Sequence, residues 1–129
     1  DEISEILNKR SKWFLFLNTP ETHVPYDYGD GLSDRLKTIL GKVKPLWGGK
    51  ECVTVDVTDE EWQTLHNAQI KAAESLDGKI ENLVSKLSGK KMVIICGDHG
   101  EVFGEHGKYG HGFPHDKVFE VPMWIAKLD

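Results

Sequence analysis

Three apolar runs along the chain predict β-strands. Residues 92–96 form a short, β-branched run that Gly97 ends, and residues 13–17 (WFLFL) are entirely apolar over the length of a strand. Continuous apolar runs are typical of strands that helices cover on both faces, as in parallel sheets. Residues 121–128 predict a third strand, with Pro122 at its start or at a sheet edge. The pattern therefore favours an α/β fold with a mostly parallel sheet.

A stripe of apolar residues at helical spacing predicts one long helix. Over residues 62–87 the apolar positions recur every three or four residues. Thr58 is the expected N-cap, and Glu61 completes a capping box with it. Gly89 is the expected C-terminal stop. The first residues of the chain predict a shorter helix that ends at residues 9–11.

Two stretches have weaker patterns. Residues 29–50 contain several glycines and Pro45 and show no clean period, which predicts a partly helical surface excursion. Val53, Val55 and Val57 alternate with polar residues, which predicts either a short edge strand or an extended linker. Neither stretch carries a motif with obvious chemistry.

Composition and charge exclude two classes of protein. The 129 residues suit a single soluble domain, with 39% hydrophobic residues. The net charge of −5, from 16 basic and 21 acidic side chains, argues against a nucleic-acid surface. No run approaches the roughly 20 apolar residues that a membrane span needs. The chain opens on Asp1, so a targeting signal upstream would not be visible and the compartment stays open.

The two cysteines indicate no structural cross-link. Cys52 and Cys96 lie far apart in the sequence without a CxxC spacing, which argues against a disulfide framework or a zinc knot. Cys96 belongs to the predicted strand, where we expect it to behave as a small buried hydrophobe.

The stretch 93–112 concentrates the candidate chemistry, with three histidines and three carboxylates. Asp98 and His99 emerge where the predicted strand ends, at the sheet edge where open α/β sheets bind ligands. A carboxylate beside an imidazole suits a divalent cation, and glycines on both sides permit the turn that brings both to one ion. Asp98 and His99 are therefore candidate metal ligands; the alternative is that they are ordinary turn residues.

The other polar residues of this stretch are weaker candidates. His111 lies between two glycines and is either an active-site residue or an exposed loop residue. Glu101, Glu105 and His106 could be further ligands or could orient the ligands by hydrogen bonds, and each is more often structural. His115 is expected at the surface, at the start of a helical turn.

Another candidate histidine, His23, lies in the loop after the WFLFL run. Pro25 biases Val24 toward an extended backbone, so the loop can project His23 over the sheet edge. If the WFLFL and MVIIC strands are neighbours in one parallel sheet, His23 converges with Asp98 and His99 in one cleft. The alternative is an ordinary structural loop histidine. His66, within the long predicted helix, is expected to be partly buried without a ligand role.

Four segments, in order along the chain, resemble one known family. The segments are LFLNTPETHVPY, ESLDGKIENLVSKL, VIICGDHGEVFGEHGKYGHG and FEVPMWI. Together they resemble the C-terminal half of the catalytic domain in the sulfatase branch of the alkaline phosphatase superfamily. The DHGExFGEHG string with its following GHG is the most specific of them. The resemblance implies a three-layer sandwich, of which this chain would hold a partial, mostly parallel sheet flanked by helices.

The resemblance also implies roles for individual residues. Asp98 and His99 would be ligands of the catalytic metal, which is usually calcium in sulfatases and often zinc or manganese in related phosphoesterases. His23 matches a histidine that contacts the sulfate or phosphate group. His111 matches a position beside the transferring group, or on a second metal in two-metal relatives. Asp77 matches a helix aspartate that we treat as structural.

Two features depart from the family pattern. Sulfatases use a nucleophile made within a C/S-x-P/A-x-R motif, whereas Cys52 is followed by Val, Thr, Val and Asp. Metal-binding aspartates on a first strand ahead of the WFLFL run are also absent. We therefore expect residues 1–129 to be a single-domain fragment that lacks the N-terminal half and the nucleophile, and to be inactive by itself. A missing half would leave an open strand edge, so we also expect self-association.

These observations leave three hypotheses. The first is a metal-dependent sulfuric ester hydrolase acting on a small-molecule ester in the parent protein. The second is a phosphoesterase, phosphotransferase or phosphonate hydrolase of the same superfamily, which the identity of the nucleophile would decide. The third is a noncatalytic domain that binds a metal or a partner, which tight metal binding by the chain alone would favour.

Overall fold

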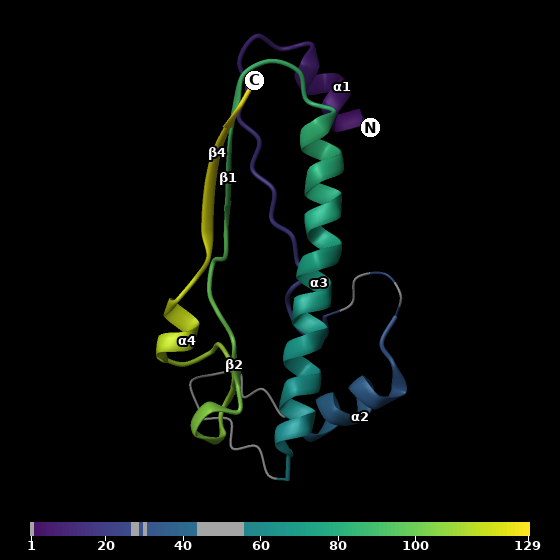
Figure 1. Cartoon of the computed structure of the whole chain (residues 1–129), viewed down its shortest axis with the longest axis vertical. Coiled ribbons are helices and arrows are strands. Elements are labelled where there is room, and N and C mark those ends of the chain that lie inside the picture. The colour runs from purple at the N-terminus through teal and green to yellow at the C-terminus, as the bar shows by residue number, and fades with distance from the viewer. Residues whose placement is uncertain (1, 27–28, 30, 44–55) are drawn as a thin grey trace.

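The computed structural model describes residues 2–26, 29, 31–43 and 56–129. Figure 1 shows an elongated molecule, in which a long helix, α3 (Asp59–Ser85), and a pair of strands run along the longest axis. The helices and strands are mixed along the chain, as the predicted α/β content requires. Cys52, Val53 and Val55 lie outside the described residues.

The start of α3 confirms the predicted capping box. The Thr58 side chain accepts a hydrogen bond from the backbone N–H of Glu61 (3.3 Å), and the Glu61 carboxylate accepts one from the backbone N–H of Thr58 (2.9 Å). The predicted end is wrong: the helix ends at Ser85, and Gly89 lies in the turn beyond it. Asn8 makes hydrogen bonds to the backbone of residues 86 and 88, which satisfies polar groups where the helix ends.

Two shorter helices match the predictions from sequence. The N-terminal helix is α1 (Glu2–Asn8), and the partly helical excursion contains α2 (Asp34–Lys42). The Ser33 side chain caps α2 by accepting from the backbone N–H of Leu36 (3.2 Å). Of the helices within the described ranges, none is long and apolar enough to cross a membrane.

The strands correct the predicted sheet. Strand β1 (Lys91–Cys96) pairs with β4 (Met123–Leu128) in antiparallel register, and the two-residue strands β2 (Val102–Phe103) and β3 (Tyr109–Gly110) form a second antiparallel pair. The mostly parallel sheet predicted from the sequence is therefore wrong for the part of the chain that the structure describes. The last predicted strand is present, with Pro122 just ahead of it as expected.

The predicted central strand at residues 13–17 is also wrong. These residues have irregular backbone, and the side chains of Phe14 and Phe16 are 89% and 78% exposed. A strand needs a partner for its backbone hydrogen bonds, and within the described residues β1 pairs only with β4. Among the described residues, the apolar run at 13–17 therefore has no strand to pair with, although its composition is typical of a central strand.

The hydrophobic core lies at one end of the molecule. It forms where the first half of α3 packs against α2, the loop that ends at Tyr26 and the β2–β3 pair. The buried members of this core are Tyr26, Leu36, Ile39, Val43, Leu65, Ala72 and Tyr109. Leu65 and Tyr26 are almost completely buried. The core is therefore small, and it places its buried tyrosines beside the loops that carry the candidate histidines.

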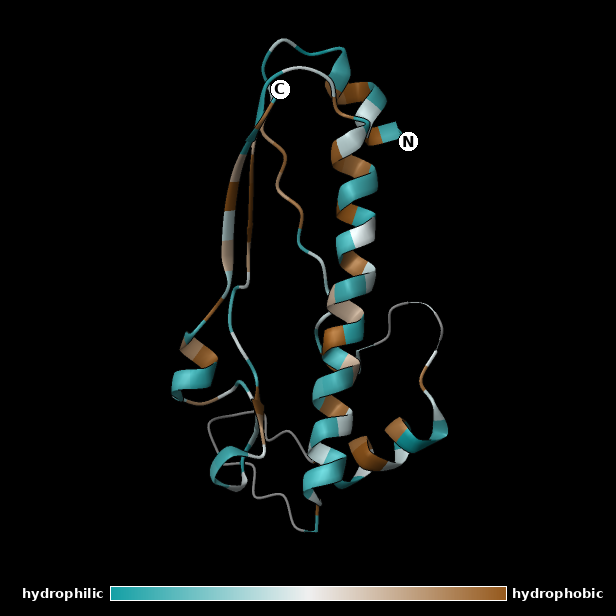
Figure 2. Cartoon of the chain, viewed as in Figure 1, coloured by the Kyte–Doolittle hydropathy of each residue, from teal (hydrophilic) through white to brown (hydrophobic). Residues whose placement is uncertain are grey.

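The other end of the molecule leaves apolar strand surface uncovered. Exposure alternates along β1, whereas every residue of β4 is exposed. Figure 2 shows apolar residues along both strands. Cys96 is exposed rather than buried as predicted, because no element covers its face of β1 within the described residues.

This uncovered ribbon predicts self-association of the chain. Ile94 and Trp124 are 57% and 61% exposed on a two-stranded sheet, and each strand presents an outer edge to which another chain can add. We expect sedimentation velocity to detect oligomers that grow with concentration. Trp124→Glu should shift the distribution toward monomer, whereas Ile70→Glu on the exposed face of α3 should not. A strictly monomeric wild-type chain at high concentration would contradict this expectation.

Candidate active site

Three histidines from distant parts of the sequence converge in the structure. The rings of His99 and His111 stack with centroids 3.9 Å apart, and the ring of His23 meets the His111 ring edge-on at 5.2 Å. His23 lies in the loop after residues 13–17, His99 follows β1, and His111 follows β3. His23 and His99 therefore converge on the His111 ring, as predicted for this pair, although the strands of the described residues form no parallel sheet.

The loop that carries His23 is anchored to the middle of α3. Gln69 donates a hydrogen bond to the carbonyl of Thr22 (3.3 Å), and Lys79 pairs with Glu21 (3.2 Å). The loop then turns back, since the backbone N–H of Tyr26 donates to the carbonyl of His23 (2.8 Å). These contacts fix the position of the His23 loop relative to α3.

The turn that carries Asp98 and His99 is held by the segment between α4 and β4. Gly97 N–H donates to the Pro122 carbonyl (3.1 Å), and Gly100 N–H donates to the Val118 carbonyl in α4 (Asp116–Phe119; 2.8 Å). Within the turn, the Asp98 carboxylate accepts from the backbone N–H of His99 (3.0 Å). The Asp98 side chain is 85% exposed, so its carboxylate remains accessible to a ligand.

All three rings make the same kind of hydrogen bond through Nδ1. The acceptors are oxygen atoms: the Val24 carbonyl for His23 (2.7 Å), the Gly100 carbonyl for His99 (2.9 Å) and the Glu101 carboxylate for His111 (3.0 Å). A carbonyl or an ionised carboxylate can only accept, so Nδ1 must carry the hydrogen in each ring. In the neutral rings, Nε2 therefore keeps its lone pair for a ligand or a proton.

A buried pair of tyrosines lies directly beside this cluster. The hydroxyl groups of Tyr26 and Tyr109 are 2.9 Å apart, and both residues are almost fully buried. Burial raises the pKa of Tyr26 well above its ordinary value, and the nearby Tyr109 and the charge on Glu101 raise it further. The Tyr26 phenol therefore stays neutral throughout the physiological range.

Glu101 is the functional candidate that sequence reasoning grouped with weaker ones. Its side chain is only 3% exposed, and it belongs to the same hydrogen-bonded group as His111. Glu105 instead accepts from the backbone N–H of Phe103 (2.6 Å), so it holds the β2–β3 loop, and His106 is exposed. The only signal in the sequence was that Glu101 lies two residues after the candidate ligand His99; Glu105 and His106 follow in the same short stretch.

Two other histidines lie outside the cluster. His66 is exposed on α3 rather than partly buried as predicted, and its ring contacts the ring of Phe103 at 5.1 Å. His115 starts the helical turn α4, as predicted, and its Nδ1 accepts from the backbone N–H of Lys117 (3.1 Å). The ring of His115 therefore carries its hydrogen on Nε2, opposite to the three clustered rings.

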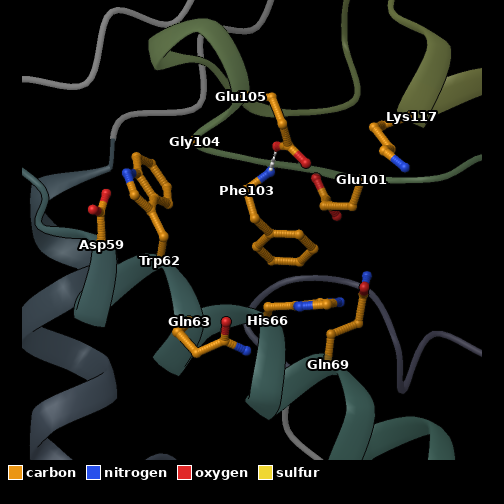
Figure 3. Close-up of a pocket in the computed structure, with 10 residues that line it drawn as sticks. All are labelled: Asp59, Trp62, Gln63, His66, Gln69, Glu101, Phe103, Gly104, Glu105 and Lys117. Carbon is orange, nitrogen blue, oxygen red and sulfur yellow. Dashed lines mark hydrogen bonds between the residues drawn. The ribbon is translucent and has the colours of Figure 1, made fainter.

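A cavity of about 520 Å³ lies on the other side of Glu101. Figure 3 shows Trp62, His66 and Gln69 of α3 on one wall, facing Glu101, Glu105 and Lys117 on the other. The Trp62 indole lies flat against the backbone of Gly104, where a Cβ atom would come within 2.6 Å of it. Because none of the three clustered histidines lines this cavity, the candidate site and the cavity share only the Glu101 side chain.

Asp98 and His99 form a partial donor set for a metal ion. Their nearest side-chain donors, Asp98 Oδ1 and His99 Nε2, are 3.8 Å apart, which suits two neighbouring ligands of one divalent ion after a small adjustment. Within the described residues, no group of three or more His, Cys, Asp or Glu side chains could hold a metal ion. Asp98 and His99 therefore fit two of the ligand positions around a divalent metal ion.

Comparison with known proteins identifies the family. A family model for sulfatases matches residues 1–126. The chain belongs to the sulfatase family. No curated protein and no solved structure matches it. Membership agrees with the mixed helix and strand content and with hydrolase chemistry in the family, whereas the roles of the individual residues in this sulfatase-family chain remain predictions.

The close approach at Gly100 predicts a strong effect of substitution. A Cβ atom there would lie 1.9 Å from the carbonyl oxygen of Lys117, so Gly100→Ala must push the site turn away from α4. We expect a loss of about 1–3 kcal/mol in the free energy of unfolding, measured by urea denaturation. Gly78→Ala is the matched control, since open space surrounds Gly78 in α3 and alanine should add about 1 kcal/mol there. Equal stability of the Gly100→Ala variant and wild type would contradict the packing described here.

The raised pKa of Tyr26 predicts how stability depends on pH. In the unfolded chain this phenol loses its proton near pH 10, whereas in the folded chain it stays protonated to higher pH. Its contribution is therefore fully present below about pH 10 and is lost as pH rises above that value, at about 1.4 kcal/mol per pH unit. The Tyr26→Phe variant has no phenol to titrate and should lack this contribution. Urea denaturation should therefore show that the free energy of unfolding of the wild type, relative to that of the variant, falls between pH 9 and pH 11, roughly the range around an ordinary tyrosine pKa. A constant difference would argue against the burial of a protonated phenol.

Proposed function

We propose that this chain supplies part of the active site of a metal-dependent sulfuric ester hydrolase. The observation that carries the proposal is the convergence of His23, His99 and His111, whose Nδ1 atoms are all engaged and whose Nε2 atoms remain for chemistry. Family membership supports the reaction class. The substrate class is a small-molecule sulfate ester.

In this proposal His23 and His111 act on the ester group itself. Because Nδ1 already carries a hydrogen in both rings, a further proton on Nε2 makes the ring an imidazolium, which can donate a hydrogen bond to an anionic oxygen and can pass that proton to a leaving-group oxygen. His111 lies against both other rings, so it is the better placed of the two to transfer a proton while His23 binds an oxygen of the sulfate group.

Asp98 and His99 would hold the metal ion. The carboxylate of Asp98 suits calcium, and the imidazole of His99 also suits manganese or zinc. When bound, the ion would polarise an oxygen of the ester and stabilise the charge that develops on it. Two side chains make a weak site, because stable sites usually have three or four protein ligands.

The proposal places the nucleophile and the remaining ligands outside this chain. Support comes from the sequence: Cys52, followed by Val, Thr, Val and Asp, lacks the proline or small residue and the arginine of the sulfatase nucleophile motif. The uncovered apolar faces of β1 and β4 are compatible with a sheet that other strands complete. We therefore expect the chain alone to bind the metal ion but not to hydrolyse a sulfate ester.

Metal titration and activity assays test this proposal together. We expect calorimetry to detect binding of Ca²⁺, Mn²⁺ or Zn²⁺ with a Kd weaker than about 1 µM, because two ligands leave most of the shell to water. Asp98→Asn should abolish this binding, whereas Asp34→Asn, at an exposed carboxylate of α2, should leave it unchanged. Aryl sulfate and aryl phosphate assays with each metal should show no turnover by the chain alone.

Three outcomes would contradict parts of the proposal. Robust turnover that is lost in Asp98→Asn would mean that the chain carries its own nucleophile. Turnover restored by the remaining part of the parent protein on phosphate esters alone would select the phosphoryl branch of the superfamily. Binding much tighter than 1 µM by the chain alone would favour a noncatalytic metal-binding domain.

A further inference from the structure

We infer that Glu101 is a positioning residue that fixes the tautomer and the orientation of the His111 ring. The role in catalysis rests on the proposed function, whereas the positioning itself rests on contacts within this chain. Glu101 precedes β2 and His111 follows β3, so both lie at the same end of the antiparallel pair, and the pairing of Val102 with Gly110 brings them next to one another. Their side chains meet with Oε1 and Nδ1 3.0 Å apart.

Burial makes the interaction between these two side chains specific. The Glu101 side chain is 3% exposed and the His111 side chain is 25% exposed, so the carboxylate has little access to water. A buried carboxylate that lacks a donor is strongly destabilising, and the Nδ1–H group of His111 is such a donor. The ring is thereby held with its hydrogen on Nδ1 and with Nε2 directed away from Glu101.

The other two clustered rings are held differently. His23 and His99 each donate from Nδ1 to a backbone carbonyl within one residue of themselves, so the local backbone fixes their tautomers. His111 alone among the three depends on a side chain ten residues away. A single substitution can therefore release His111 while it leaves the other two rings in place.

Without Glu101, the stacking of His111 on His99 would not fix the tautomer. Stacked imidazole rings at 3.9 Å attract one another whichever nitrogen carries the hydrogen. The edge-on contact with His23 likewise sets the position of the ring rather than its protonation. The Glu101 carboxylate is thus the contact that determines which nitrogen of His111 remains available to a substrate.

The test reads the tautomer of each histidine directly. Long-range ¹H–¹⁵N spectra of the ¹⁵N-histidine-labelled chain are recorded at a pH at which the ¹⁵N shifts themselves show neutral rings. We expect His111 to carry its hydrogen on Nδ1 in the wild type. His115 supplies an internal reference of the opposite tautomer, because its Nδ1 accepts a backbone hydrogen bond.

Substitutions of Glu101 then separate positioning from a merely structural role. Glu101→Ala should move His111 largely to the Nε2–H form while the signals of His23, His99 and His115 keep their tautomers. Glu101→Gln keeps the volume and an acceptor oxygen, and should restore most of the Nδ1–H form. Glu101→Asp withdraws the carboxylate by one methylene and should give a mixture, which keeps the test decisive if the alanine variant does not fold.

The matched control is Glu120→Gln, which removes an exposed carboxylate that pairs only with Lys117 among the described contacts. It should leave all four tautomers unchanged. An Nε2–H form of His111 in the wild type would overturn the inference, as would a His111 signal that is the same in wild type, Glu101→Ala and Glu101→Asp. The measurement needs neither metal nor substrate, so failure of the proposed hydrolase activity would be seen separately in the turnover assays.

Discussion

A hydrogen bond between two buried phenol groups joins the loops that carry His23 and His111. Tyr26 closes the loop of His23, and Tyr109 lies two residues before His111. Both phenols are almost completely removed from water, so their hydroxyl groups need hydrogen-bond partners inside the core, and the bond between them supplies one such partner to each. This requirement sets the relative positions of two histidines that are distant in the sequence. The aromatic rings around the pair, including Phe103 and Trp62, fill the space between them and α3.

The arrangement of the site follows from this packing. Leu65 of α3 belongs to the same core as the tyrosines and has no exposed surface, and the first half of the same helix forms one wall of the neighbouring cavity. The capping box at Thr58 starts the helix at the point where it enters this core. Local signals in the sequence and the long-range contacts of the core therefore agree at this end of the molecule, which is typical of the parts of a protein that fold to one structure.

The difference between local signals and long-range contacts explains which predictions from sequence succeeded. The capping box and the spacing of apolar residues predicted α3, because both act between residues a few positions apart. The run at residues 13–17 has the composition of a central strand, but strand formation depends on partners elsewhere in the chain, and the described residues supply none. The end of α3 at Ser85 depends on Asn8, nearly eighty residues away. The contact between Glu101 and His111 arises from the register of a two-residue strand pair that periodicity does not reveal.

The position of the core at one end of α3 has a consequence for how the molecule opens. Native-state hydrogen exchange is slowest where backbone amides are both hydrogen-bonded and covered by packed side chains. The backbone of the β1–β4 ribbon is hydrogen-bonded, but many of its side chains are exposed to solvent. The side chains of the tyrosine pair and Leu65 are buried. The ribbon would thus separate in excursions of low free energy, and His99 would be disturbed before His23 and His111, because its turn follows β1 and is held by the segment ahead of β4. The tyrosine core that holds His23 and His111 would open only at a higher free energy, so the two ends of the molecule would differ in how readily their amides exchange.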